Sequence, residues 1–148
     1  MAAPIIAKMN RRALLETIPA LALGKIAFAE ASSPESTPGT VYELRQYTPT
    51  PGKLDELLAR FRDHTIAIFN RHNMRSLAYW TVIDPAPDTP GLVYILVHPS
   101  REEATKNWAA FHDDPEWIKV KADSEVHGSL TVRTQSTWMK ATDFSPLK

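Results

Sequence analysis

The sequence predicts one α+β domain in the order βαββαβ, a four-stranded antiparallel sheet with two helices on one face. Three observations after residue 40 predict this fold. Four short segments alternate apolar and polar residues or are almost wholly apolar, which is typical of strands. Two longer segments between them repeat apolar residues at three- and four-residue spacing, which is typical of amphipathic helices. A proline-rich turn joins the second and third strands, as in a hairpin.

The N-terminal half of the domain is expected to contain a strand, a long helix and the hairpin. Residues 41–48, VYELRQYT, are β-branched and aromatic and alternate as a strand does. A helix of about five turns is expected over residues 54–72, and Asn73 suits the left-handed conformation that ends many helices. Residues 74–84 and 91–98 form the hairpin; the second is nearly all apolar, which predicts a central strand covered on both faces.

The second helix is expected to break and restart before the last strand. Ser100 and Glu103 match the S-x-x-E pattern of a capping box, so a helix begins there. Asp114 is a good N-cap and Pro115 fits the first helical position, so a new helical segment begins at an angle to the first. Residues 130–142 alternate again and complete the sheet.

The first 31 residues are expected to be an export signal. Arg11 and Arg12 precede two leucines and a modestly apolar stretch, and Ala29 and Ala31 form an A-x-A processing pattern. The segment resembles a twin-arginine signal peptide, which implies the export machinery as a partner and a periplasmic or otherwise exported protein. A retained amphipathic helix and an organellar transit peptide stay open as alternatives, as does a translation start at the methionine just before the arginines.

The chain is therefore expected to consist of four segments. These are an export signal at 1–31, a linker at 32–40, the domain at 41–142 and a polar tail at 143–148.

No uncharged apolar run of about 18 residues follows residue 40, so the domain is not expected to cross a membrane. Seventeen basic residues balance seventeen acidic ones, which argues against nucleic acid as a partner. The absence of cysteine excludes disulfides and thiolate chemistry.

The predicted sheet has one face without helices, and burial of that face predicts a homodimer. Its expected aromatic and apolar residues are Tyr47 or Leu44, Trp80 or Tyr79, and Trp138. A second copy that packs sheet against sheet would cover them through a two-fold interface.

Five segments carry a resemblance to a known family. They are YELRQY at 42–47, PGK at 51–53, RHNM at 71–74, SREEA at 100–104 and WAAFHDDPEW at 108–117. Together they resemble the NIPSNAP domain, within the dimeric α/β-barrel superfamily. The resemblance implies a ferredoxin-like βαββαβ protomer that dimerises through its sheet into an α/β barrel, and it implies little about chemistry. In related families, small molecules bind between the helices and the sheet, so the resemblance favours a pocket there.

The five histidines show no compact metal-ligand spacing, and no metal site is expected. His64 is the candidate base, because the helical spacing of its neighbours predicts that its ring faces the sheet. There it could bind a ligand, act as a base or only hydrogen-bond a neighbour. His98 and His112 are expected to be ordinary histidines at an element end or the surface.

Arg45 shares one face of the first strand with Glu43 and Tyr47, and two interpretations stay open. It could form a cross-strand ion pair at the dimer sheet, or it could bind an anion in the barrel. Trp108 and Phe111 are spaced to face the sheet. Their main expected role is to fill the core, and the alternative role is to line a pocket. The candidate ligand-binding residues are Arg45, Tyr47, His64, Trp80, Trp108 and Phe111.

Three functions are compatible with these observations. The leading hypothesis is an exported homodimer that binds a small hydrophobic molecule or serves as an accessory protein. The second is a cofactor-independent monooxygenase or isomerase that acts on a planar hydrophobic substrate, with His64 as base. The third is a structural subunit of a hetero-complex. No cofactor can be named from the sequence.

Overall fold

The computed structural model describes residues 39–84, 86 and 88–147. The expected export signal at 1–31 lies outside these described residues, and so does most of the expected linker at 32–40.

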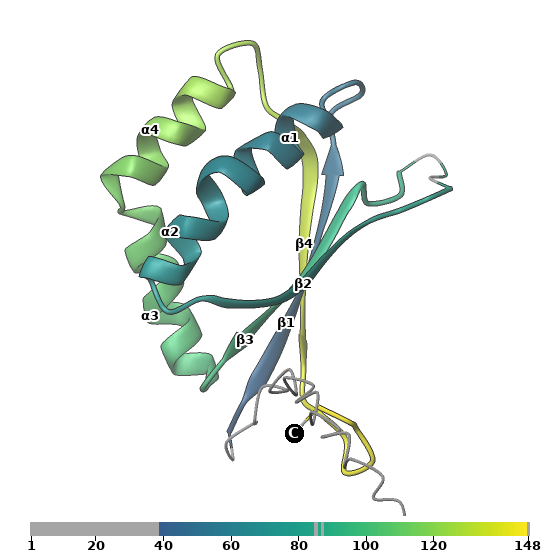
Figure 1. Ribbon diagram of the computed structural model, residues 1–148, viewed down its shortest axis with the longest axis vertical. Coiled ribbons are helices and arrows are strands. Elements are labelled where there is room, and N and C mark those ends of the chain that lie inside the picture. The colour runs from purple at the N-terminus through teal and green to yellow at the C-terminus, as the bar shows by residue number, and fades with distance from the viewer. Residues whose placement is uncertain (1–38, 85, 87, 148) are drawn as a thin grey trace, which may run out of the picture. The chain divides into compact units, whose positions relative to one another are not determined.

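Four strands form one antiparallel sheet, which confirms the predicted fold (Figure 1). The strands are β1 (Val41–Pro49), β2 (Arg75–Thr81), β3 (Leu92–His98) and β4 (Thr131–Met139), in the order β2-β3-β1-β4. The predicted hairpin is the pair β2 and β3, and β3 is a central strand as its continuous apolar sequence indicated. This order places β1, which carries Glu43 and Arg45, in the middle of the sheet beside the edge strand β4.

The helices lie on one face of the sheet (Figure 1). The first predicted helix consists of α1 (Leu54–Arg60), a π-helical turn η1 (Phe61–Thr65) and α2 (Ile66–Arg71). The second is α3 (Arg101–His112) followed by α4 (Pro115–Ser124), with the break where it was predicted. Among the described residues, no helix is both long enough and apolar enough to cross a lipid bilayer.

The π-helical turn changes which side chains of the first helix face the sheet. A π turn contains more residues than an α turn, so the buried stripe advances by an additional position. Phe61 and Thr65 are buried, and the Thr65 hydroxyl donates to the Arg60 carbonyl at 3.2 Å. His64 is exposed. The expectation that His64 faces the sheet is therefore wrong, because it assumed an uninterrupted α-helical spacing.

The predicted helix ends are confirmed. The Ser100 side chain accepts the N–H of Glu103 at 3.2 Å, and Asp114 accepts that of Glu116 at 2.8 Å, so each caps its helix. Asp114 also accepts from Arg71 at 2.9 Å, which ties the start of α4 to the end of α2. Asn73 has a φ of 56°, the left-handed conformation expected after α2.

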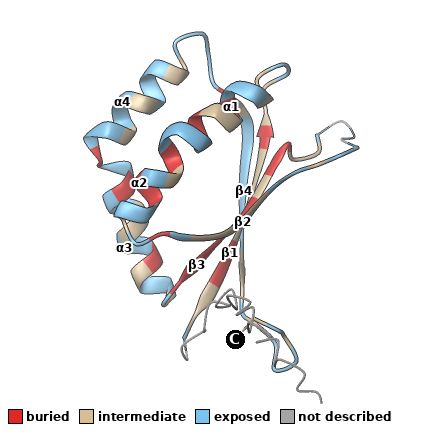
Figure 2. Cartoon of the chain, viewed as in Figure 1, coloured by how far each residue is buried: buried red, intermediate tan, exposed pale blue. Residues whose placement is uncertain are grey.

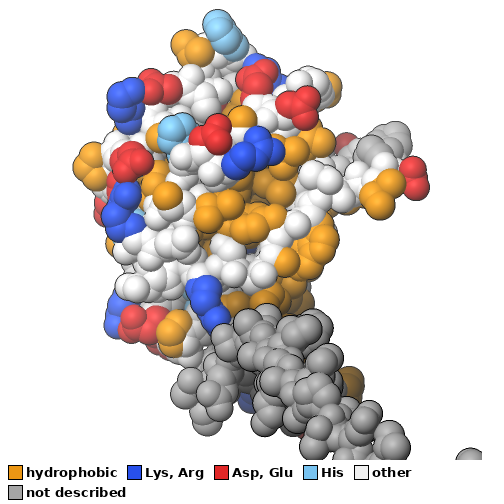
Figure 3. Space-filling view, viewed as in Figure 1, with side chains coloured by type: hydrophobic (Ala, Val, Ile, Leu, Met, Phe, Trp, Pro, Cys, Tyr) orange, Lys and Arg blue, Asp and Glu red, His pale blue; other side chains and the backbone are white. Residues whose placement is uncertain are grey.

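The core lies between the helices and the sheet. Figure 2 shows buried positions on the sheet-facing sides of the helices and along the central strands. On the face in Figure 3, hydrophobic side chains gather between the helices and the sheet, while charged side chains lie mainly over the helices. The buried hydrophobic cluster is Leu57, Phe61, Ile68, Phe69, Met74, Leu92, Tyr94, Leu96, Phe111 and Leu130.

The helix-free face carries Leu44 and Trp80, whereas Tyr47 and Tyr79 pack against the core. Trp80 is 48% exposed, the expected consequence of a face without helices. Trp138 was expected on this face, and that expectation is wrong. Its ring lies 5.6 Å from the ring of buried His98 and under the Arg101 guanidinium of α3, so it points to the helix side.

Candidate functional site

A cavity of about 270 Å³ lies between the helices and strands β1 and β4, and we call it the inner cavity. Its lining residues are Arg45, Tyr47, Arg60, Phe61, Thr65, Phe69, Trp108, Phe111, His112, Trp117, Lys121, Glu125, Ser129, Thr131 and Thr134. Four of the six predicted ligand-binding residues meet here: Arg45, Tyr47, Trp108 and Phe111.

The other two predicted residues, His64 and Trp80, lie elsewhere. Trp80 is on the helix-free face of the sheet, next to Tyr79 in a strand whose side chains alternate. His64 lines a wider groove of about 620 Å³ between α1 and α4, which we call the outer groove. The outer groove is lined by Glu56, Ala59, Arg60, Asp63, His64, Glu116, Lys119, Val120, Asp123, Ser124, Val126 and His127.

The walls of the inner cavity are aromatic because two helices meet at the Asp114 cap. The Phe111 ring, near the end of α3, lies 4.5 Å from the ring of Trp117, which is in the first turn of α4. It also lies 4.8 Å from Phe69 and 5.6 Å from Trp108. These rings therefore serve as core and as cavity wall at once, as the sequence suggested for Trp108 and Phe111.

Arg45 is the charged residue at the floor of the cavity. Its Nη1 donates to Glu43 Oε1 at 2.9 Å and its Nη2 to the Tyr47 hydroxyl at 3.2 Å, while its Cζ lies 4.7 Å from the Trp108 ring centre. Burial alone would lower the pKa of Arg45, but its interactions with Tyr47, Tyr94 and Glu43 outweigh it and raise that pKa. The guanidinium is thus a fixed positive charge, and its partner lies on the same strand rather than across a dimer sheet.

Glu43 is the shared hydrogen-bond acceptor that connects the side chains of this floor. It is 1% exposed, and its two carboxylate oxygens accept from four side chains. Arg45 and Ser136 donate to Oε1 at 2.9 and 2.6 Å; Trp108 lies 2.8 Å and His98 3.2 Å from Oε2. Burial would raise the pKa of Glu43, but the hydrogen bonds and the Arg45 charge lower it to about 2. Glu43 therefore stays ionised at neutral pH.

Sequence reasoning missed the part that Glu43, His98 and Ser136 have in this network. His98 was expected to be an ordinary strand-end histidine, but it is fully buried, and among the described residues its Nδ1 has no partner. Ser136 comes from β4, the strand paired with β1, where it lies opposite Arg45. One signal was present in the sequence: an acidic residue alternates with Arg45 on a strand that the fold places in the middle of the sheet.

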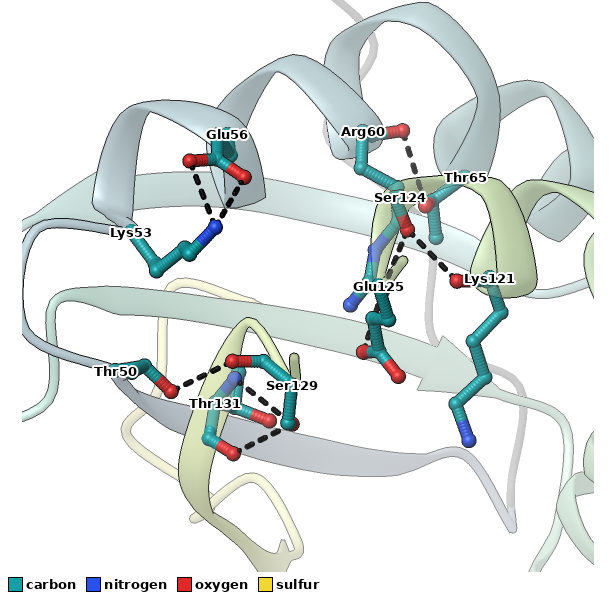
Figure 4. Close-up of polar contacts among 10 residues, drawn as sticks. All are labelled: Thr50, Lys53, Glu56, Arg60, Thr65, Lys121, Ser124, Glu125, Ser129 and Thr131. Atoms are coloured by element: carbon teal, nitrogen blue, oxygen red, sulfur yellow. Dashed lines mark hydrogen bonds and ion pairs between the residues drawn. The ribbon is translucent and has the colours of Figure 1, made fainter. Parts of the chain in front are cut away.

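The mouth of the cavity is polar (Figure 4). Arg60 donates from Nη1 to Glu125 at 2.9 Å and to Ser124 at 3.2 Å, so its charge is paired. Lys121 extends from α4 toward the sheet in Figure 4, and its ammonium has no hydrogen bond or ion pair with any described residue. The hydroxyl of Ser129, in the turn before β4, lies at the same opening. The mouth therefore offers one unpaired positive charge.

His112 is the one histidine that lines the inner cavity. Its ring stacks on that of Trp108, with centres 5.5 Å apart and planes 22° apart. Its pKa is lowered, first by burial and then by the positive charges of Arg45 and Lys121. Its imidazole is consequently neutral at neutral pH. Among the described residues no group of three or more His, Asp or Glu side chains is arranged to hold a metal ion.

Comparison with known proteins finds a match to the NIPSNAP family model over residues 42–146. None of the curated proteins matches the chain. Solved structures that it resembles include an uncharacterised NIPSNAP-like domain protein from Burkholderia xenovorans, with 24% identity and a TM-score of 0.63, covering 72% of this chain and 89% of that one.

Two Agrobacterium tumefaciens proteins are also similar in structure. One NIPSNAP family protein has 21% identity and a TM-score of 0.64, covering 74% of this chain and 99% of that one. Another, described as of unknown function, has 24% identity and a TM-score of 0.64, covering 74% and 95%. At these identities the likeness concerns the fold.

Proposed function

The chain belongs to the NIPSNAP family, and we propose that it is an exported homodimer that binds a small molecule in the inner cavity. The observation that carries binding is the inner cavity itself. Its walls are aromatic, and its floor presents the fixed charge of Arg45. Sites for small molecules combine such an apolar lining with a few convergent polar groups.

The homodimer is supported by the helix-free face of the sheet. Leu44 and Ile95 lie opposite each other on β1 and β3, and exposed Trp80 lies on the neighbouring strand β2. A second copy with the same surface would bury these side chains through a two-fold contact. The tail after β4 borders this face, because its residues Ala141, Thr142 and Leu147 line a hollow together with Tyr42 and Ile95.

Export is supported by sequence alone, through Arg11, Arg12 and the pattern Ala29-Glu30-Ala31. A native mass spectrum of the protein isolated from its own host tests the three parts of the proposal together. The expected result is a dimer processed before Ser32 that carries additional small-molecule mass. An unprocessed chain would contradict export, a monomer at micromolar concentration would contradict the dimer, and a stoichiometric second chain would favour a structural subunit of a hetero-complex.

A second candidate function is base catalysis, as in an isomerase or a cofactor-independent oxygenase, and the place of His112 favours it. A neutral imidazole in the cavity can accept a proton from a substrate held beside Arg45. His64, the base expected from the sequence, lies in the outer groove and is not beside the cavity. Turnover of a candidate planar substrate should fall at least about 100-fold in His112→Ala and stay unchanged in His64→Ala. Equal turnover in wild type and His112→Ala would exclude this function.

A further inference from the structure

The inner cavity has spare hydrogen-bond donors and no spare charged acceptor at its floor. Both oxygens of Glu43 already accept two donors each, so a ligand finds no free carboxylate there. At the mouth, the Glu125 carboxylate pairs with Arg60. Among the residues that line the cavity, a cationic ligand would therefore find only this carboxylate, whose charge Arg60 already balances.

The spare donors belong to Arg45, Tyr47 and Lys121, together with the Nε of Arg60, which is buried and has no partner among the described residues. The Nε of Arg45 is buried and has no partner among the described residues. The Tyr47 hydroxyl oxygen accepts from both Arg45 and Tyr94, at 3.2 and 3.0 Å, which leaves its own proton free to donate. The Lys121 ammonium is the unpaired charge at the mouth. An unsatisfied buried donor such as the Arg45 Nε is costly, and Tyr47 and the exposed Lys121 add donors that a bound acceptor can use.

The size and walls of the cavity restrict the rest of the ligand. Its volume of about 270 Å³ lies just below the usual range for ligand sites, which is roughly 300–1,000 Å³, so the ligand must be small. The rings of Trp108, Phe111 and Trp117 line it. Aromatic walls favour a flat apolar body that can pack against ring faces and edges.

We propose that the inner cavity binds a small planar carboxylate, with its rings against Trp108 and Phe111 and its carboxylate between Arg45 and Lys121. This inference rests on the proposed function and adds the chemical class of the ligand. Carboxylate oxygens satisfy the Arg45, Tyr47 and Lys121 donors together, and charge-assisted hydrogen bonds of this kind are the strong ones.

Three probes with the same ring system test the class of ligand on the full chain by calorimetric titration at low ionic strength. They are 2-naphthoate, the neutral 2-naphthamide and the cationic 2-naphthylmethylamine. We expect 2-naphthoate to bind about tenfold more tightly than 2-naphthamide, because a hydrogen bond to a charged group is worth more than one to a neutral amide. The amine should bind most weakly of the three.

Substitutions test which side chains cause the preference for 2-naphthoate over 2-naphthamide. Lys121→Gln should weaken 2-naphthoate about threefold, as expected for an exposed charge, and should leave 2-naphthamide unchanged. The matched control is Lys119→Gln, because Lys119 lies on the same helix but pairs with Asp123 on the outer groove. The control should change neither affinity.

The floor is tested by the double variant Glu43→Gln with Arg45→Gln, which removes the pair together and leaves no buried charge alone. We expect the tenfold preference for 2-naphthoate to fall to about threefold, the part that Lys121 supplies, while 2-naphthamide still binds within about twofold. Retained binding of the amide shows that the cavity is intact.

The outcomes separate this inference from the function on which it rests. Equal binding of 2-naphthoate and 2-naphthamide, or tightest binding of the amine, would overturn the carboxylate class and leave small-molecule binding in place. Absence of binding by all three probes, together with no retained mass in the native spectrum, would overturn both.

Discussion

The inner cavity and the outer groove share residues of α1, η1 and α4, and Arg60 lines both, but their charged side chains differ in burial and in partners. At the floor of the inner cavity, Glu43 is 1% exposed and has four fixed partners. In the outer groove, the paired side chains of Lys119 and Asp123 are 75% and 64% exposed. Exposed pairs are screened and mobile, whereas buried ones have one geometry. Burial and fixed partners, more than residue type, therefore distinguish a candidate site from a charged surface.

The largest expected effect comes from removal of the carboxylate that orders the inner cavity. Glu43→Ala leaves the Arg45 charge and the Trp108 N–H without their acceptor, so we expect the free energy of unfolding to fall by about 3–5 kcal/mol. Denaturant titration measures this change. The matched control is Glu56→Ala in the outer groove, where the carboxylate is 53% exposed and pairs with Lys53, and the loss should stay within about 1 kcal/mol. Equal losses of unfolding free energy in the two variants would show that the buried and the exposed carboxylate contribute alike to stability.

The next largest effect is expected from a fall in pH, which should destabilise the protein through Glu43 of the inner cavity. The pKa of Glu43 is about 2 in the folded protein, against a reference of 4.5, so the folded state binds this proton more weakly than the unfolded state does. The ionised Glu43 therefore contributes about 3 kcal/mol to the free energy of unfolding. This contribution is complete above about pH 5 and is lost as the pH falls toward 2. Stability measured between pH 6 and 2 should therefore fall less steeply in Glu43→Gln than in wild type. The pKa of Asp114 is also lowered, first through its bonds from His72 and Arg71, so a residual slope should remain in the variant. Parallel slopes in the two proteins would contradict the assignment.

A smaller effect tests the π-helical turn that separates the regions. Thr65 is buried and its hydroxyl donates to the Arg60 carbonyl, so Thr65→Val should lower the free energy of unfolding by about 1–2 kcal/mol. Thr105 makes the same kind of bond to the Arg101 carbonyl at 3.0 Å on the exposed side of α3. Thr105→Val should change stability by no more than about 0.5 kcal/mol, since water replaces the lost bond. Denaturant midpoints of both variants give the comparison directly.

Local patterns in the sequence were sufficient to predict the fold. Alternation identified the strands, and Ser100, Asp114 and Asn73 marked helix ends because each acts on its own neighbouring backbone. The helix-free face was predicted less well. Trp138 turned out to face the helices because its side depends on the pairing register with β1, where it lies opposite Glu43.

The candidate site was predicted in part for the same physical reason. Arg45, Tyr47, Trp108 and Phe111 come together because strand alternation and helical spacing both direct them inward. The Glu43 network could not be predicted, because it joins residues from β1, β3, β4 and α3 that are far apart in the sequence. His64 was placed on the wrong side because nothing local in the sequence signals a π-helical turn.

The smallest expected effect is that of a substitution of His64. It tests most directly whether the inner cavity or the outer groove is the ligand site. The side chain is exposed in the outer groove, so His64→Ala should change the free energy of unfolding by no more than about 0.5 kcal/mol. Binding of 2-naphthoate should also be unchanged, since His64 does not line the inner cavity. His112→Ala is the informative counterpart, because it removes a ring that stacks on Trp108 at the cavity and should weaken binding. Loss of binding in His64→Ala with normal binding in His112→Ala would reverse the comparison and make the outer groove the ligand site.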